Sequence, residues 1–179
     1  GLGDVYKRQV LPYAVFDDSM RRGYMDRVEL LAEYETALQN EEFKVYYQPV
    51  VEAATGNLVS AEALVRWVHP QRGLVSPAVF IPALESSGQI SRLDWYVAEH
   101  VYKTILRSYR ENFPMVPVSV NLSWMDFYDD SLMDDLMDIF QGDSLRRGDM
   151  RLEITETSYA ALESDRAGIL EQLRSAGVK

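Results

Sequence analysis

The sequence predicts an α/β fold with a largely parallel sheet, and three observations lead to that prediction. Short apolar stretches alternate with longer amphipathic ones along most of the chain, as in α/β domains. From the third expected strand on, each unit of strand and helix takes about 30 residues, the usual length of a parallel crossover. Four strands are expected in 179 residues, whereas a complete eight-stranded barrel takes about 250. The chain therefore corresponds to an incomplete barrel or to a small open sheet.

Composition excludes several classes of protein. With 47% hydrophobic and 26% charged residues, the chain can form one core, and it has neither a signal-peptide pattern nor a membrane segment of about 18 apolar residues. The absence of cysteine excludes disulfides and thiolate metal sites and indicates a reducing, cytoplasmic compartment, with an upstream membrane anchor in the parent protein left open. The net charge of −10 argues against a nucleic acid polymer as partner.

The first 41 residues divide into two segments. Residues 1–9 fit no later pattern and are expected to be a non-native or disordered tail. Residues 10–41 are expected to be a linker between domains. Its helix would cover about 21–40, because apolar residues recur there at helical spacing from Tyr24 to Leu38.

The next segment predicts an antiparallel hairpin. Residues 43–51 are expected to form a strand, which Pro49 places at a sheet edge or at a strand end. A short turn then leads into the strand at 58–70, and so short a gap favours a hairpin over a crossover.

The remaining pattern alternates helices and strands. Ser76 and Pro77 begin a helix that Gly88 ends, and Ser91 is expected to cap the next helix with Asp94 three residues on. The other expected elements are strands at 116–123 and 151–157 and helices at about 126–141 and 159–176.

Three expected strands each carry a polar side chain on one face, namely Glu62, Asn121 and Glu153. In a barrel the apolar faces of these strands would pack against helices, so the polar faces would point inward. Two carboxylates and one amide oxygen are hard ligands, which suit Mg²⁺ or Mn²⁺ better than zinc. Arg66 shares the face of Glu62, and its planar guanidinium could hold a phosphate.

A structural interpretation of the same residues stays open. Solvated residues of an edge strand, or structural ion pairs, would produce the same pattern. His69 and His100 are read as a turn residue and a helix-face residue. Trp67 and Trp95 are expected in the core.

A series of motifs occurs in one order along the chain. They are Tyr47-Gln48-Pro49, Glu62-Ala63-Leu64-Val65-Arg66-Trp67, His69-Pro70, Gly73, Pro77, Phe80-Ile81-Pro82, Glu85, Asn121-Leu122-Ser123 and Glu153-Ile154-Thr155-Glu156. Over residues 42–179 the chain resembles the N-terminal half of the EAL domain, a family of bacterial phosphodiesterases that cleave cyclic di-GMP to linear pGpG. The resemblance implies a TIM-like (β/α) barrel whose first strand is antiparallel to the second, here truncated after about four strands.

The resemblance also implies roles for individual residues. Glu62, Asn121 and Glu153 would ligate metal, with two Mg²⁺ or Mn²⁺ ions in the complete domain, and Glu62 would thereby be catalytic. Glu156 would support catalysis by steadying a loop near the metals. Arg66 would hold a phosphate of cyclic di-GMP, and the groove for the dinucleotide would be lined by Gln48, Leu64 and Pro82.

The same resemblance implies partner domains for this chain and implies that the chain alone is inactive. Residues 10–41 are similar to the linker that joins a GGDEF domain to an EAL domain, so the parent chain is expected to carry a GGDEF domain upstream and could act as a homodimer. The family's remaining catalytic residues would lie beyond Lys179, so residues 1–179 alone are expected to be inactive. The alternative is a cyclic di-GMP receptor that binds without hydrolysis.

Overall fold

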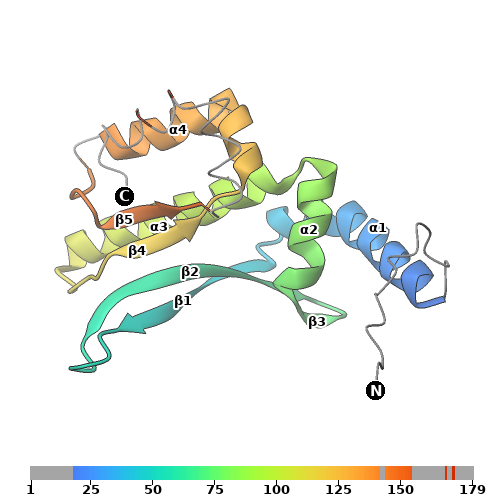
Figure 1. Ribbon diagram of the computed structural model, residues 1–179, viewed down its shortest axis with the longest axis horizontal. Helices are drawn as coiled ribbons and strands as arrows, with labels where there is room; N and C mark the ends of the chain where they lie inside the picture. Colours follow the sequence, from blue (N-terminus) through green and yellow to red (C-terminus); the bar gives the residue numbers. More distant parts are fainter. Residues whose placement is uncertain (1–17, 142–143, 155–167, 169–170, 172–179) are drawn as a thin grey trace, which may run out of the picture.

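The computed structural model describes residues 18–141 and 144–154, together with Gly168 and Glu171. Its elements are α1 (Asp18–Gln39), β1 (Phe43–Val51), β2 (Leu58–His69), β3 (Gly73–Val75), α2 (Pro77–Ser87), α3 (Ile90–Glu111), β4 (Val118–Asn121), the 3₁₀ helix η1 (Trp124–Tyr128), α4 (Asp130–Gln141) and β5 (Met150–Glu153) (Figure 1). Among these described residues, no helix has both the length and the apolar character needed to cross a membrane.

The sheet is open and has five strands. Its main order is β1-β2-β4-β5, and the short β3 pairs with β2. The first strand is antiparallel to β2, whereas β2, β4 and β5 are mutually parallel. The predicted α/β class, the hairpin and the parallel strands that follow it are therefore confirmed.

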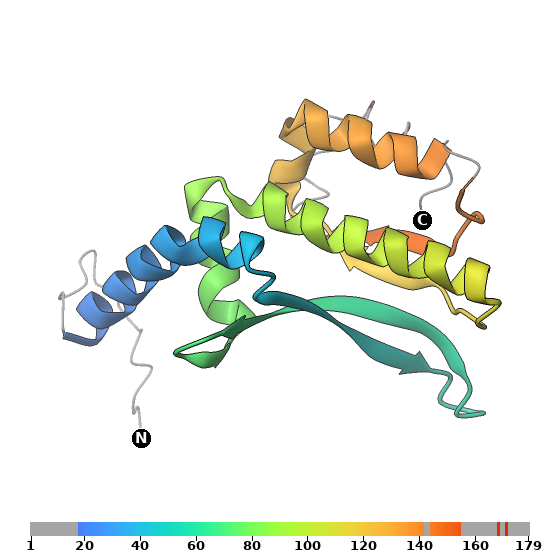
Figure 2. The ribbon, with the colours of Figure 1, turned by 180° about the vertical axis from the view of Figure 1, so that it is seen from behind.

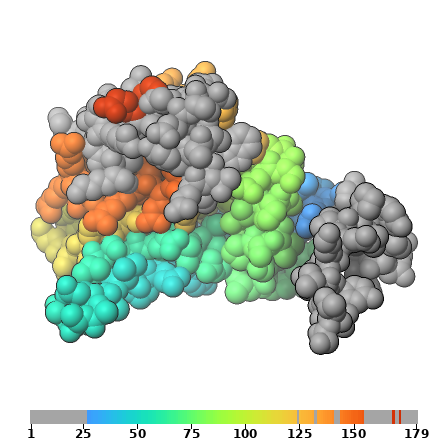
Figure 3. All heavy atoms as spheres, in the orientation of Figure 1, coloured from blue at the N-terminus to red at the C-terminus, as the bar shows by residue number. Residues whose placement is uncertain are grey.

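The hairpin of β1 and β2 is long, and its tip projects at the lower left of the molecule (Figure 3). The two strands pair from Phe43↔Trp67 to Val50↔Ser60, with a break in register after Val50. Apolar side chains near the tip remain in solvent, since Val51 and Leu58 are 55% and 50% exposed. Pro49 lies on β1, which is the edge strand of the described sheet, as Pro49 predicts.

Helix α3 covers one face of the sheet (Figure 2), and the larger core lies between them. This helix presents an apolar stripe to the core, in which Leu93, Val97, Val101 and Ile105 are all buried. The sheet contributes its small and β-branched side chains to this core, and α4 closes it from beside β5. Members from the sheet and α4 include Ala63, Val118, Val120, Met133, Leu136, Met150 and Leu152.

A second core joins α1 to the domain. Three residues of this helix, Leu30, Tyr34 and Ala37, are at most 3% exposed. They pack with aromatic and aliphatic residues from β1, β2, α2 and the start of α3, namely Phe43, Trp67, Phe80, Leu84, Ile90 and Leu93. The helix expected at about 21–40 is thus present, and one face of it is part of a hydrophobic core.

Three local expectations were wrong. The structure has the additional strand β3, which is too short to show alternation in the sequence. Gln89, not Ser91, precedes α3, and the Asp94 carboxylate accepts a hydrogen bond from the backbone of Ser123 instead of closing a capping box. Helix α4 begins at Asp130, four residues later than expected, because η1 occupies the preceding turn.

Other expectations fall outside the described residues. These are the tail at residues 1–9, the helix at 159–176 and the end of the strand expected at 151–157.

Candidate functional site

The polar face of β2 is the face turned away from α3. Burial alternates along this strand as the sequence predicts: Ala61, Ala63 and Trp67 are buried, whereas Glu62 and Arg66 are only half-buried. Across the hairpin Glu62 stands directly opposite Gln48. Because side chains of directly paired residues lie on the same face of a sheet, these two side chains are neighbours on the polar face.

The three expected metal ligands come from three adjacent strands. Asn121 is the last residue of β4 and Glu153 is the last residue of β5, and the two are register partners. The side-chain amide Nδ2 of Asn121 donates a 2.8 Å hydrogen bond to Glu62 Oε1. The sheet therefore brings Glu62 and Asn121 into contact and places Glu153 beside Asn121. Asn121 and Glu153 lie at the carboxyl ends of their parallel strands, whereas Glu62 lies within β2.

The backbone after Asn121 is fixed on both sides. Leu122 is buried, and its N–H donates to the carbonyl oxygen of Glu153 at 2.9 Å. The N–H of Ser123 donates to the carboxylates of Asp94 at 3.1 Å and Asp126 at 2.8 Å. These bonds hold the end of β4 between β5 and α3.

The residues expected to bind substrate lie on separate elements. Leu64 is on β2 opposite Tyr46, next to Glu62 on the same face, and Gln48 is on β1. The Arg66 guanidinium donates through Nη1 to the carbonyl oxygen of Val65 at 2.9 Å. Pro82 lies inside α2, a helix found at the end of the sheet near β3 (Figure 1). The sheet thus groups Gln48, Glu62 and Leu64, while Pro82 belongs to a neighbouring helix.

The donors on this face fit a hard divalent cation. Among the residues that the structure describes, no group of three or more His, Asp or Glu side chains could hold a metal ion. On the polar face of the sheet, the described part of the chain supplies the carboxylates of Glu62 and Glu153 and the amide of Asn121. The Asn121 atom that bonds Glu62 is the amide nitrogen, so the amide oxygen, which is the ligating atom, is not used in that bond.

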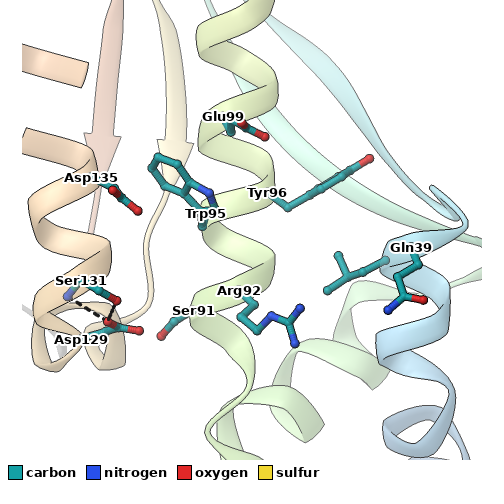
Figure 4. Close-up of a pocket in the computed structure, with 10 residues that line it drawn as sticks. Gln39, Ser91, Arg92, Trp95, Tyr96, Glu99, Asp129, Ser131 and Asp135 are labelled. Atoms are coloured by element: carbon teal, nitrogen blue, oxygen red, sulfur yellow. Dashed lines mark hydrogen bonds between the residues drawn. The ribbon is translucent and has the colours of Figure 1, made fainter. Parts of the chain in front are cut away.

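A pocket of about 370 Å³ lies elsewhere, along α3 between α1 and α4 (Figure 4). Trp95 points toward α4, and the Tyr96 hydroxyl donates to the carbonyl oxygen of Phe43 at the start of β1. Trp95, expected in the core, is only partly buried, whereas Trp67 is fully buried as expected. None of the expected site residues lines this pocket, which therefore does not belong to the polar face of the sheet.

Comparison with known proteins identifies the family. The family model described as "EAL domain" matches residues 31–179, which is most of the chain. The chain belongs to the EAL family.

Two of the relatives are cyclic di-GMP enzymes by name. The bifunctional diguanylate cyclase/cyclic di-GMP phosphodiesterase MucR of Pseudomonas aeruginosa is 31% identical over 93% of this chain and 24% of its own length. The cyclic di-GMP phosphodiesterase NbdA of the same species is 29% identical over 84% of the chain and 19% of its own length. This chain therefore spans about a quarter or less of these curated relatives.

A solved structure agrees with the fold of the EAL domain. The PaMucR phosphodiesterase in complex with c-di-GMP superposes with a TM-score of 0.75 at 31% identity, covering 84% of this chain and 61% of that one. The open sheet described above thus matches part of a larger EAL structure.

Two residues near the EAL site were missed as a pair by sequence reasoning. Asp94 is expected to cap its own helix, and Asp126 only to begin a helix, yet both carboxylates meet at Ser123. They are 32 residues apart in sequence, so no local signal joins them. Glu156, the expected supporting residue, lies outside the described residues.

Proposed function

We propose that the protein containing this chain hydrolyses cyclic di-GMP to linear pGpG with the help of divalent metal ions. The observation that supports this most directly is the 2.8 Å hydrogen bond between Asn121 and Glu62, with Glu153 in register beside Asn121. Two relatives are cyclic di-GMP phosphodiesterases by name. Asn121 and Glu153 end their parallel strands, which is where barrel enzymes build their active sites.

The proposed metal ligands are Glu62, Asn121 and Glu153, with Mg²⁺ or Mn²⁺ as the ions. Divalent cations held by such ligands neutralise phosphate charge and activate water in phosphodiester cleavage. The hydrogen bond from Asn121 orients the Glu62 carboxylate, and the fixed backbone at Leu122 keeps the amide in place. We place Glu156 in a supporting role, as the family resemblance implies.

The proposed substrate contacts use the same face. Arg66 would hold a phosphate through the part of its guanidinium not bonded to Val65, because a planar fork can bind two phosphate oxygens. Gln48 and Leu64, on either side of Glu62, would contact the dinucleotide. Pro82 would line the groove from α2.

The test is an assay of the full-length protein with cyclic di-GMP and Mg²⁺ or Mn²⁺, with products separated by chromatography. We expect pGpG to form, and we expect Glu62→Gln to abolish its formation because one ligand charge is lost. The matched control is Glu111→Gln, which changes an exposed glutamate at the end of α3 that pairs with Arg107; its activity should equal that of the wild type. Tight binding of cyclic di-GMP without pGpG would refute hydrolysis and place the protein among the non-catalytic receptors.

The wider context is also part of the proposal. We place the domain in the cytoplasm, after a GGDEF domain in the same parent chain and in a homodimer. The bifunctional name of MucR and the small share of that protein covered by this chain support an additional domain. The mass of the full-length protein in solution tests the homodimer, and the sequence of the parent gene upstream of residue 1 tests the GGDEF domain.

A further inference from the structure

The carboxyl groups of Asp94 and Asp126 accept hydrogen bonds from one backbone N–H, two residues after Asn121 of the candidate site. The N–H of Ser123 donates to Asp94 Oδ2 at 3.1 Å and to Asp126 Oδ2 at 2.8 Å. Asp126 is fully buried, and its second oxygen, Oδ1, has no hydrogen-bond partner among the described residues. The Asp126 carboxyl is buried and that of Asp94 is half-buried, and both accept from the same single N–H. A proton held between the two carboxyl groups would remove one of the two negative charges from this poorly solvated place.

The surroundings favour such a proton. Burial and the neighbouring Asp126 carboxyl raise the pKa of Asp94 well above its usual range. Burial also raises the pKa of Asp126, which faces the Ser91 hydroxyl. The charged groups that act on the pair from neighbouring segments, Glu85 of α2 and Asp129 after η1, are acids as well. Each of these negative charges makes a doubly ionised pair less favourable.

The pair is placed where it can control the candidate site. Ser123 is two residues after Asn121, and Leu122 between them is bonded to Glu153 of β5. The Ser123 bonds tie the end of β4 to α3, while the Asn121 amide bonds Glu62. Without the hydrogen bonds from the Ser123 N–H to Asp94 and Asp126, the backbone that carries the Asn121 side chain would be less restrained.

We propose that Asp94 and Asp126 share one proton, and that this carboxyl–carboxylate pair is a positioning device that holds Asn121 at the candidate metal site. Asp94 would act through Ser123 and would not touch substrate. The consequence for the EAL site rests on the proposed function; the shared proton and the fixed backbone do not.

The test compares Asp94→Asn with Asp94→Ala in the full-length protein. Asparagine can donate its amide hydrogen to Asp126 as the shared proton would, but it does not titrate in this range, whereas alanine removes the tie. Hydrogen–deuterium exchange of the peptide covering 119–127, corrected for intrinsic rates, is measured between about pH 5 and pH 9, which spans a raised carboxyl pKa. The control is Asp134→Asn, which makes the same charge change at an exposed position of α4.

We expect wild-type protection of this peptide to fall as pH rises, protection in Asp94→Asn to stay high throughout, and protection in Asp94→Ala to be low throughout. The control should follow the wild type. If Asp94→Asn exchanged as fast as Asp94→Ala, or if the wild type lost no protection that the asparagine variant keeps, the shared proton would be refuted.

Mn²⁺ affinity separates this proposal from the proposed function. Partners of metal ligands commonly change affinity by about 10–100-fold when removed, so we expect that loss in Asp94→Ala and a much smaller one in Asp94→Asn. The exchange results could hold while the wild type binds no Mn²⁺. In that case the carboxyl pair would still be shown to fix the backbone at Asn121, and the proposed metal-dependent function would be refuted. Equal Mn²⁺ affinity in the wild type and in Asp94→Ala would refute the positioning role.

Discussion

The ring of His69 joins the end of β2 to helix α1 through the carboxylate of Glu33. His69 is only 5% exposed, and its Nε2 bonds Glu33 Oε2. Its Nδ1 accepts the backbone N–H groups of Gln71 at 3.1 Å and Arg72 at 3.2 Å. Because Nδ1 accepts, the proton lies on Nε2 and points at the carboxylate. The residue therefore orders the turn that precedes β3 and anchors the helix at the same time.

Replacing this histidine should loosen α1. We expect His69→Ala to lower the free energy of unfolding by about 1–3 kcal/mol, because Glu33 and two backbone N–H groups lose their partner. Urea denaturation measures the loss, and hydrogen exchange of residues 27–39 locates it. His100→Ala is the control, since His100 is exposed on α3 and should change stability by less than about 0.5 kcal/mol. Equal losses in the two variants would show that the contact with α1 contributes nothing.

Exchanging the amide of Asn121 for a carboxylate should make stability depend on metal. In Asn121→Asp the hydrogen bond to Glu62 is replaced by repulsion between two carboxylates. We expect a lower melting temperature than wild type without metal, and a larger rise on adding Mn²⁺, because the ion binds the folded state. Asn121→Ala should lose stability without this recovery. If Mn²⁺ did not change the melting temperature of Asn121→Asp, the assignment of Asn121 as a metal ligand would be contradicted.

The second residue after the end of α1 offers a stabilising change. Glu41 has φ of 55°, in the left-handed region that favours glycine. We expect Glu41→Gly to raise the free energy of unfolding by about 0.5–1 kcal/mol, since glycine adopts this conformation without strain. Asn112 has φ of 52° at the end of α3, but asparagine tolerates this region, so Asn112→Gly should gain less. A destabilised Glu41→Gly variant would overturn this reasoning.

Stability at alkaline pH should depend on Tyr96. Its hydroxyl donates a 2.8 Å hydrogen bond to the carbonyl oxygen of Phe43, and burial, with a smaller effect of Glu41, raises its pKa above the ordinary value. The unfolded state therefore ionises first, so the contribution is complete below about pH 10 and is lost as pH rises through the raised pKa. We expect wild type to exceed Tyr96→Phe by about 1 kcal/mol at neutral pH. Denaturant titrations from neutral to strongly alkaline pH should show this difference shrinking; a constant difference would count against it.

The 179 residues expressed alone should associate through β1. This edge strand exposes Tyr46 and Val50 by 55% and 44%, and unpaired edges with apolar side chains pair with other chains. We expect association at micromolar concentration, and Val50→Lys should reduce it. Phe113→Lys changes a residue that is 68% exposed outside the sheet and should have little effect. A monomer with a sharp, reversible melt, measured by sedimentation and circular dichroism, would refute the prediction.

Alternation and spacing in the sequence were sufficient to predict most of this fold. The strand expected at 58–70 differs from β2 by one residue, because its small and apolar residues alternate with polar ones over a long run. The strand β3 could not be predicted, since three residues show no period and its pairing depends on the turn after His69. The start of α4 was misplaced because Ser123 and Asp126 form a capping box around a 3₁₀ turn.

The candidate site was predictable only as a set of residues. Alternation put Glu62 on the polar face, and motif order linked it to Asn121 and Glu153, which the structure places on adjacent strands. The meeting of Asp94 with Asp126 depends on how α3 crosses β4, and tertiary packing of that kind leaves no mark on local sequence. For this reason Asp94 looked like an ordinary helix cap.

Helix α1 has a mechanical consequence for the protein. Its 22 residues span roughly 33 Å at 1.5 Å per residue, and its C-terminal part lies in a core with Phe43 and Trp67. The helix is therefore a rod with one end set in the domain, reinforced by the bonds of Glu29 to Arg72 and Glu35 to Arg92. A force applied at its N-terminal end would therefore be transmitted to the anchored C-terminal half of the helix. Strand β1 follows this helix directly in the chain, so it is the first strand that such a force would displace. This strand carries Gln48 opposite Glu62.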